Sequence, residues 1–141
     1  MIRYFDENKN PLKEGEVGVY QIECPTMQDF LNAGNPDNIK WIDDVPYFKT
    51  EQELFMEQVP DMVNELWHSA NSYIDGQLSS QDRDAMLFRM LTNGYYHQER
   101  CTANINWLSA IWTEYFTRKA TLEAGYPVNF DFSNMGNRPY N

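Results

Sequence analysis

The chain has 141 residues, of which 42% are hydrophobic and 15% aromatic, and its formal net charge is -10 at pH 7. This length and composition predict one globular domain with its own core. The acidic excess argues against nucleic acid and anionic membranes as partners, because clustered Lys and Arg bind both. No stretch approaches the ~20 apolar residues of a bilayer span, and the charged N-terminus lacks the apolar part of a signal peptide, so we expect a cytoplasmic product.

Residues 1–49 are rich in Gly and Pro, and their apolar runs are short. This pattern predicts small strands joined by turns, with one or two helical turns at residues 26–33. Two antiparallel hairpins are expected. They pair residues 2–5 with 17–22, and residues 39–42 with 46–48 on either side of Asp43 and Asp44.

Asp6, Asn8 and Asn10 stand at alternate positions in the first hairpin loop, like the opening of a calcium-binding loop. Such a loop also needs Gly at its sixth position and a bidentate Glu at its twelfth. This chain has Pro11 and Val17 there. Because Asp and Asn side chains also bond their own backbone in turns, we interpret the segment as a hairpin loop that binds no metal.

Thr50, followed three residues later by Glu53, forms a capping box and predicts a helix start. The helix should continue to Gly76, and Pro60 should kink it or start a new helix. Acidic residues from Glu51 to Glu65 are expected on a solvated face that is dispensable for folding. The apolar face has Phe55, Val59, Met62, Val63, Leu66, Trp67, Ala70 and Tyr73.

A further helical stretch is predicted to begin at a cap of Ser79 or Ser80. Gly94 can break it in two, which favours a hairpin of two antiparallel helices over a long coiled coil. Gly125 and then Pro127 end it. Its heptad-like seam has Leu87, Leu91, Gly94, Gln98, Cys101, Ile105, Leu108, Trp112, Tyr115, Lys119 and Leu122.

These elements together predict an α+β fold in a single domain, residues 1–141. It would consist of a strand and loop region at residues 1–49, a helical region at residues 50–125, and an extended tail at residues 126–141.

Aromatic residues near the end of the long helix spread over more than one helix face. One side should fill the core, and another can meet a second partner. In the tail, Val128, Phe130 and Phe132 alternate with polar residues, giving an apolar face suited to a groove or sheet edge on a neighbouring subunit. The candidate partner-binding residues are Trp107, Trp112, Phe116, Phe130 and Phe132.

The sequence contains no GxSxG, HExxH, Walker or dinucleotide-binding motif, so we expect no enzyme activity, no catalytic residues and no cofactor. Asp43 and Asp44 are adjacent and would point to opposite faces of a strand. His97 and Cys101 share a helix face, but their spacing matches no zinc module, and a Cys on an apolar seam is typical of packing. No metal site is predicted.

The stretch FDENKNPLKEGEVGVY resembles a hairpin recurrent in bacteriophage tail-fibre and tail-associated proteins. There, an Asp- and Asn-rich turn, a Pro-Leu pair, a Gly and a Val-x-x-Tyr strand follow one another. The matching residues are Asp6, Asn8, Asn10, Pro11, Leu12, Gly15, Val17 and Tyr20, while Lys9 replaces a common glycine.

The end of the chain, WTEYFTRKATLEAGYPVNFDFSNMGNRPY, resembles the close of phage tail-assembly proteins. In those proteins a helix with Trp, Tyr and Arg is followed by Gly-aromatic-Pro and an extended tail that contains Pro. Both resemblances rest on short motifs and carry over no active site.

The resemblance implies a phage or prophage tail-associated protein that binds other tail or virion proteins as an assembly factor or minor structural component. It would act in the host cytoplasm during assembly or in the virion, and a homo-oligomer is compatible with it. Two alternatives stay open. One is an acidic bacterial interaction or inhibitor module that docks on a basic partner, and the other is an enzyme without a recognisable motif.

Overall fold

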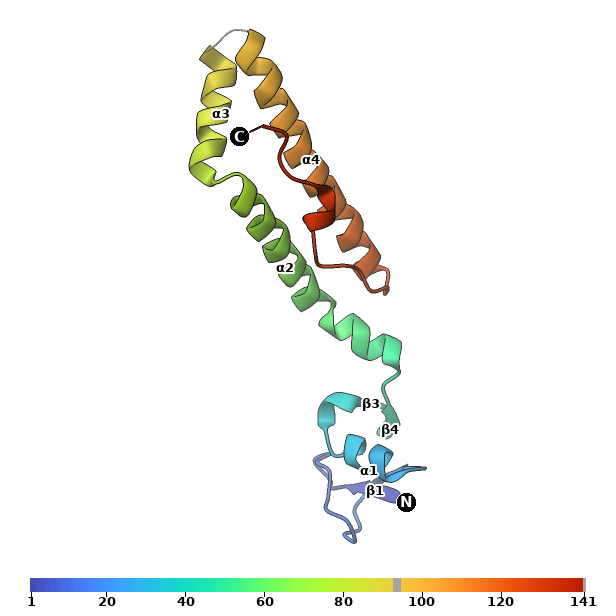
Figure 1. Ribbon diagram of the computed structural model, residues 1–141. Coiled ribbons are helices and arrows are strands. Elements are labelled where there is room, and N and C mark those ends of the chain that lie inside the picture. Colours follow the sequence, from blue (N-terminus) through green and yellow to red (C-terminus); the bar gives the residue numbers. More distant parts are fainter. Residues whose placement is uncertain (93–94, 141) are drawn as a thin grey trace. The chain divides into compact units, whose positions relative to one another are not determined.

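The computed structural model describes residues 1–92 and 95–140, with side chains described outside residues 89–98. The chain divides into two compact units, Met1–Phe55 and Met56–Asn141. Strands and short helices form the first unit and long helices the second (Figure 1). The predicted α+β class is confirmed. The predicted single domain stays a prediction, and its regions 1–49 and 50–125 meet close to the junction of the two units.

The first unit contains two separate two-stranded antiparallel sheets, β1–β2 and β3–β4, and both predicted hairpins are confirmed. A capping box between Thr26 and Asp29 starts the short helix α1, in which the Thr26 hydroxyl accepts the Asp29 N–H at 3.1 Å. The elements are β1 (Ile2–Phe5), β2 (Tyr20–Glu23), α1 (Met27–Ala33), a 3-10 turn (Pro36–Asn38), β3 (Ile39–Ile42) and β4 (Val45–Phe48).

Side chains of the loop itself close the β1–β2 hairpin. One Asp6 carboxylate oxygen accepts the backbone N–H groups of Asn8 at 2.8 Å and Asn10 at 2.9 Å. The interpretation of this segment as a hairpin loop is therefore confirmed. The β3–β4 hairpin turns over Asp43 and Asp44, whose φ angles of 50° and 62° are those of a type I′ turn. These two carboxylates are thus turn residues and not strand residues.

The core of the first unit is small and aromatic. Its buried residues come from β1, the end of β2, α1 and β3, and the Trp41 ring packs edge-on against Phe5 at 5.1 Å and Tyr20 at 5.2 Å. A Cβ on Gly18 would lie 2.2 Å from the Phe5 carbonyl oxygen, so only glycine fits where the loop crosses β1. The buried core residues are Phe5, Cys24, Phe30, Ala33 and Ile39.

Helix α2 (Glu51–Gln77) begins at the predicted capping box. The Glu53 N–H donates to the Thr50 hydroxyl at 3.1 Å, and the Thr50 N–H donates to the Glu53 carboxylate at 3.3 Å. Glu53 also pairs with Lys40 at 2.7 Å and is only partly exposed, so it is not a fully solvated residue as expected, while its dispensability for folding stays a prediction. The helix continues across Pro60, which excludes a new helix start there.

The buried face of α2 consists of Val59, Leu66, Ala70 and Ile74. Trp67 was expected on this face but is exposed, because it lies at its edge next to Leu66. Tyr73 is half-buried, and its hydroxyl reaches the tail.

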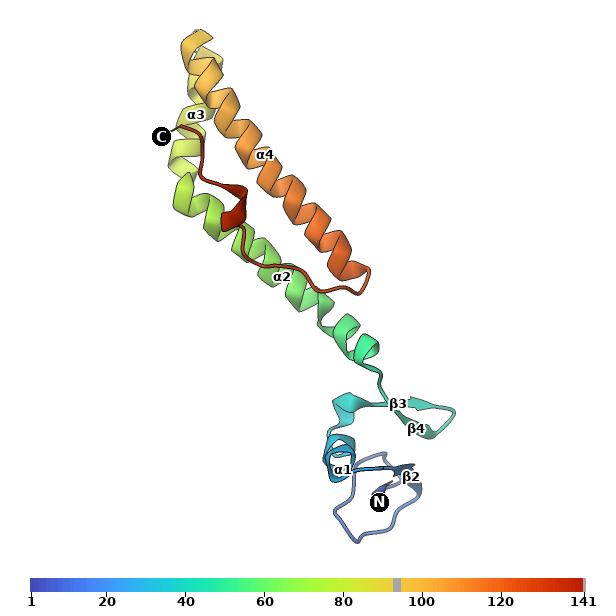
Figure 2. The same cartoon turned by 45° about the vertical axis from the view of Figure 1, so that its right-hand side comes forward.

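Helices α3 (Ser80–Thr92) and α4 (Tyr95–Glu123) pack side by side, as both views show (Figures 1 and 2). The Ser79 hydroxyl caps α3 by accepting the Asp82 N–H at 3.2 Å. The helix α4 ends as predicted at Gly125, whose φ is 94°, and bonds from Gly125 N–H to Leu122 O and from Tyr126 N–H to Thr121 O form a Schellman motif. The predicted break at Gly94 lies outside the described residues.

The buried stripe of α4 differs from the predicted seam. Leu87 of α3 is half exposed, and Ile105, Leu108, Trp112 and Lys119 are only partly buried. Because α4 is rich in aromatic residues, more than one apolar stripe can be drawn along it from the sequence. The stripe that is buried also contains two polar residues, Asn104 and Arg118. The side chains of Leu91 and Gln98, like Gly94, lie outside those described. The buried residues are Cys101, Asn104, Trp107, Ile111, Tyr115, Arg118 and Leu122.

The tail, residues 126–140, is extended apart from one 3-10 turn at Ser133–Met135, and it runs back beside α4 (Figure 1). The predicted extended tail is therefore confirmed over the described residues. Among the helices that the structure describes, none combines the length and the apolar character needed to cross a bilayer.

Candidate functional site

Four side chains of α2 and α4 hold the tail by hydrogen bonds, and we call them the tail cradle: Tyr73, Asn104, Trp107 and Arg118. They lie within the second unit, and they place the tail against α4 along most of its described length. Sequence reasoning assigned a binding role only to Trp107 among them.

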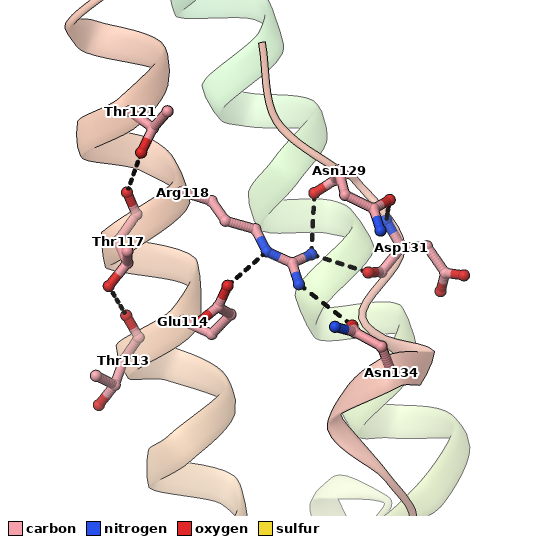
Figure 3. A network of polar contacts seen from close by, with 8 residues as sticks. All are labelled: Thr113, Glu114, Thr117, Arg118, Thr121, Asn129, Asp131 and Asn134. Atoms are coloured by element: carbon pink, nitrogen blue, oxygen red, sulfur yellow. Dashed lines mark hydrogen bonds and ion pairs between the residues drawn. The ribbon is translucent and has the colours of Figure 1, made fainter. Parts of the chain in front are cut away.

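Arg118 is the centre of the cradle and is only 7% exposed. One terminal nitrogen donates to the carbonyls of Asn129 at 2.9 Å and Asp131 at 2.8 Å, and the other donates to the Asn134 side-chain oxygen at 3.2 Å (Figure 3). Its Nε donates to Glu114 at 3.0 Å. Each guanidinium nitrogen therefore has an oxygen acceptor, which offsets the cost of burying the charge.

Phe132 lies under the same guanidinium. Its ring centroid is 4.3 Å from Arg118 Cζ, a cation–π distance, and the side chain is 1% exposed. The adjoining turn is fixed by Asp131, which accepts hydrogen bonds from the backbone N–H and the hydroxyl of Ser133. These bonds lower the pKa of the Asp131 carboxyl. Phe132 therefore belongs to the core of its own unit.

The last part of the tail is held through its main chain. The Gly136 carbonyl accepts from the Trp107 indole N–H at 2.9 Å and from the Tyr73 hydroxyl. The Asn104 amide nitrogen donates to the Tyr140 carbonyl at 2.8 Å, and its oxygen accepts the Tyr140 N–H at 3.0 Å. Asn104 thus pairs with Tyr140 as a neighbouring strand would.

A second feature lies on the face of α4 opposite the Arg118 side chain and includes Tyr126 at the start of the tail, and we call it the α4 hollow. Its rim carries Phe116, 60% exposed, and Tyr126, 65% exposed. The Thr117 and Thr121 hydroxyls donate to the helix carbonyls four residues earlier at 3.1 and 3.0 Å, so the surface is largely apolar (Figure 3). The lining residues are Thr113, Phe116, Thr117, Ala120, Thr121, Ala124 and Tyr126.

The five predicted partner-binding residues do not form one surface. Trp107 and Phe132 are buried, Trp112 and Phe130 are half-buried, and Phe116 is largely exposed. Phe132 packs on Arg118 of its own chain in this structure, and its docking on a neighbouring subunit stays a prediction. Binding of another protein by the remaining residues stays a prediction, and Phe116 offers the largest exposed ring among the five.

Metal and thiol chemistry find no support in the described geometry. No three His, Cys, Asp or Glu side chains among the described residues lie close enough to hold an ion. The His97 side chain lies outside those residues, so its pairing with Cys101 is not described. Burial raises the pKa of the Cys24 thiol, which disfavours the reactive thiolate.

Comparison of the chain with protein-family models, with curated proteins and with solved structures found no match.

Proposed function

We propose that the chain acts by binding other proteins, as a phage or prophage tail-associated protein that serves as an assembly factor or minor structural component. Its partners are other tail or virion proteins, and its action needs neither a cofactor nor a catalytic step. The α4 hollow is the observation that carries this proposal, because it exposes Phe116 and Tyr126 beside small uncharged side chains.

Aromatic side chains seated among small neighbours are typical anchors of protein interfaces, since covering them removes a large apolar area from water. The helix that carries the hollow is also held in place from behind. Arg118 fixes the C-terminal half of α4 to the tail, so a partner meets a surface that is already ordered. Such preorganisation lowers the entropic cost of binding.

The tail-associated role is supported by the resemblance of residues 5–20 and 112–140 to phage tail proteins. The first segment folds as a hairpin closed by Asp6, as the resembling pattern requires. The second segment contains the end of α4, the hollow and the tail, so the proposed binding surface lies within the part of the chain that carries the resemblance.

The test is co-expression with the products of the genes that flank its own. We expect a flanking tail protein to co-purify with the wild-type chain and not with Phe116→Asp. Phe88→Asp is the matched control, because Phe88 is 66% exposed but lies on α3, outside the hollow. Equal binding by Phe116→Asp, or no binding by any flanking tail protein, would contradict the proposal.

The acidic interaction or inhibitor module remains the second candidate, favoured by one observation. Glu57, Asp61 and Glu65 are exposed and recur every four residues along α2. A basic partner docked there would be lost when these three residues become Gln, Asn and Gln, and it would be retained by Phe116→Asp. The two variants therefore separate the two candidates.

A further inference from the structure

The tail cradle recognises the tail mainly through its main chain. Six of the seven hydrogen bonds between cradle and tail use backbone atoms of the tail, and the seventh uses the Asn134 side chain. One side chain adds selectivity, because the Phe132 ring occupies the position under Arg118. The cradle is thus a built binding site for an extended segment, and the structure shows its occupant.

Only a short link decides that this occupant belongs to the same chain. The reversal after α4 consists of Gly125, Tyr126 and Pro127, and Tyr126 and Pro127 are exposed. Opening the link breaks the two hydrogen bonds of the Schellman motif. Gly125 is buried, but its backbone is not sterically barred from leaving its φ of 94° for an extended conformation, because glycine populates both regions.

We propose that two copies of the chain exchange tails, so that residues 126–140 of each copy lie in the cradle of the other and form a homodimer. Every hydrogen bond of the cradle and the Arg118–Phe132 contact can form equally well between copies. The difference between the two states is then confined to the link and to the entropy of association, and domain exchange of this kind is a low-cost route to dimers. The tail of a second copy is the occupant because residues 126–140 are the segment whose fit to the cradle is observed.

A disulfide across the cradle distinguishes the two states. The Asn104 side chain bonds both the N–H and the C=O of Tyr140, so the two positions are direct neighbours and suit a test by paired cysteines. In a background with Cys24→Ala and Cys101→Ala, the full-length double variant Asn104→Cys/Tyr140→Cys should give a covalent dimer whose share rises with protein concentration. Each single-cysteine variant is the control for random bridging. An intramolecular bridge alone at every concentration would overturn the proposal.

A second measurement leaves the cradle intact. Sedimentation of the wild-type chain should show a dimer that grows with concentration, and deletion of Tyr126 should favour it, since a shorter link hinders the reversal within one chain. Insertion of a Gly/Ser segment between Tyr126 and Pro127 should restore the monomer. A wild-type chain and a deletion variant that both remain monomeric would overturn tail exchange. Phe116→Asp should leave the dimer unchanged, so this proposal and the binding of tail proteins fail separately.

Discussion

Polar side chains do different work in the two units. In the first unit, Asp6 and Thr26 close a turn and a helix start over two to four positions. Longer contacts join its elements, from Arg3 to the Phe30 carbonyl and from Lys40 to Glu53. In the second unit, the buried Asn104 side chain bonds Tyr140 across 36 positions, and the half-buried Tyr73 hydroxyl bonds Gly136 across 63 positions. Hydrogen bonds between residues close in sequence thus stabilise several turns and helix starts of the first unit. In the second unit, polar side chains of α2 and α4 have the sequence-distant tail as their partner.

The two units also differ in how much apolar surface they expose to solvent. Sixteen large hydrophobic side chains are exposed among the described residues, and nine of them lie in the first unit, which has 55 of the 141 residues. On the outer face of the β3–β4 hairpin, Ile42 faces Val45, and Tyr47 lies beside them. The first unit thus exposes more of its large apolar side chains. Its fold therefore relies more on the hydrogen bonds of its turns and less on core packing.

Replacing Arg118 by Ala should have the largest effect on the second unit. The change leaves three tail acceptors without their donor and removes the cation from the Phe132 ring. Breaking a buried charged network typically costs ~3–5 kcal/mol. We therefore expect urea unfolding to show a loss of about this size.

Two variants sharpen this prediction. Lys119→Ala removes the neighbouring, more exposed cation and should change the free energy of unfolding by less than ~0.5 kcal/mol. Arg118→Lys keeps the charge but loses the planar fork, so it should recover only part of the stability. An Arg118→Ala variant as stable as Lys119→Ala would show that the tail contributes nothing to the second unit.

Replacing Asn104 by Ala should have a smaller effect at the end of the same tail. It leaves the Tyr140 N–H and C=O without the amide that pairs with them. Tyr140 is partly exposed, so water replaces some of what is lost, and we expect roughly 1–2 kcal/mol, the lower part of the range for a broken buried pair. Hydrogen exchange at the Tyr140 amide should become faster, while exchange in β1 and β2 should not change.

The same contrast explains what the sequence could predict. Thr50 with Glu53, Ser79, Gly125 and the Asp6 loop act on neighbours in the sequence, and each was predicted with its structural role. Their chemistry is complete within a few residues, so no knowledge of packing is needed.

The buried stripe of α4 could not be predicted in this way. Asn104 and Arg118 read as surface residues, since isolated amides and guanidinium groups are usually exposed. They are buried because the tail supplies their partners, and nothing near them in the sequence indicates this. The one available signal was spacing: Asn104, Trp107, Ile111 and Arg118 continue a single helix face with Leu122.

A pH-dependent effect is expected within the first unit, at the start of α2. The hydrogen bond from Lys40 and that from the Thr50 N–H lower the pKa of the Glu53 carboxyl from its ordinary value of 4.5. Because the pKa of Glu53 is lower in the folded state, its ionised carboxylate stabilises the fold. This stabilisation is fully present above pH 4.5 and is lost as pH falls through the lowered pKa. Gln can still complete the capping box, so Glu53→Gln removes mainly the ion pair.

Thermal unfolding of the wild-type chain and Glu53→Gln should therefore differ at neutral pH and converge in acid. Glu51→Gln, an exposed carboxylate of the same helical turn, is the control and should show a smaller change with pH. A constant difference between wild type and Glu53→Gln down to the acid limit would show that the ion pair with Lys40 is not its source.

The smallest effect is expected on the exposed acidic row of α2. Glu57, Asp61 and Glu65 are exposed, in contrast to Glu53. Carboxylates four positions apart repel one another weakly, and exposed substitutions usually change stability by less than ~0.5 kcal/mol. The triple variant Glu57→Gln/Asp61→Asn/Glu65→Gln should therefore melt at nearly the wild-type temperature. A clear loss of stability would mean that these carboxylates stabilise the fold. They would then not be a surface reserved for a basic partner. Unchanged melting together with an intact complex would instead leave the α4 hollow as the surface that binds, because the row would then be dispensable for both folding and recognition.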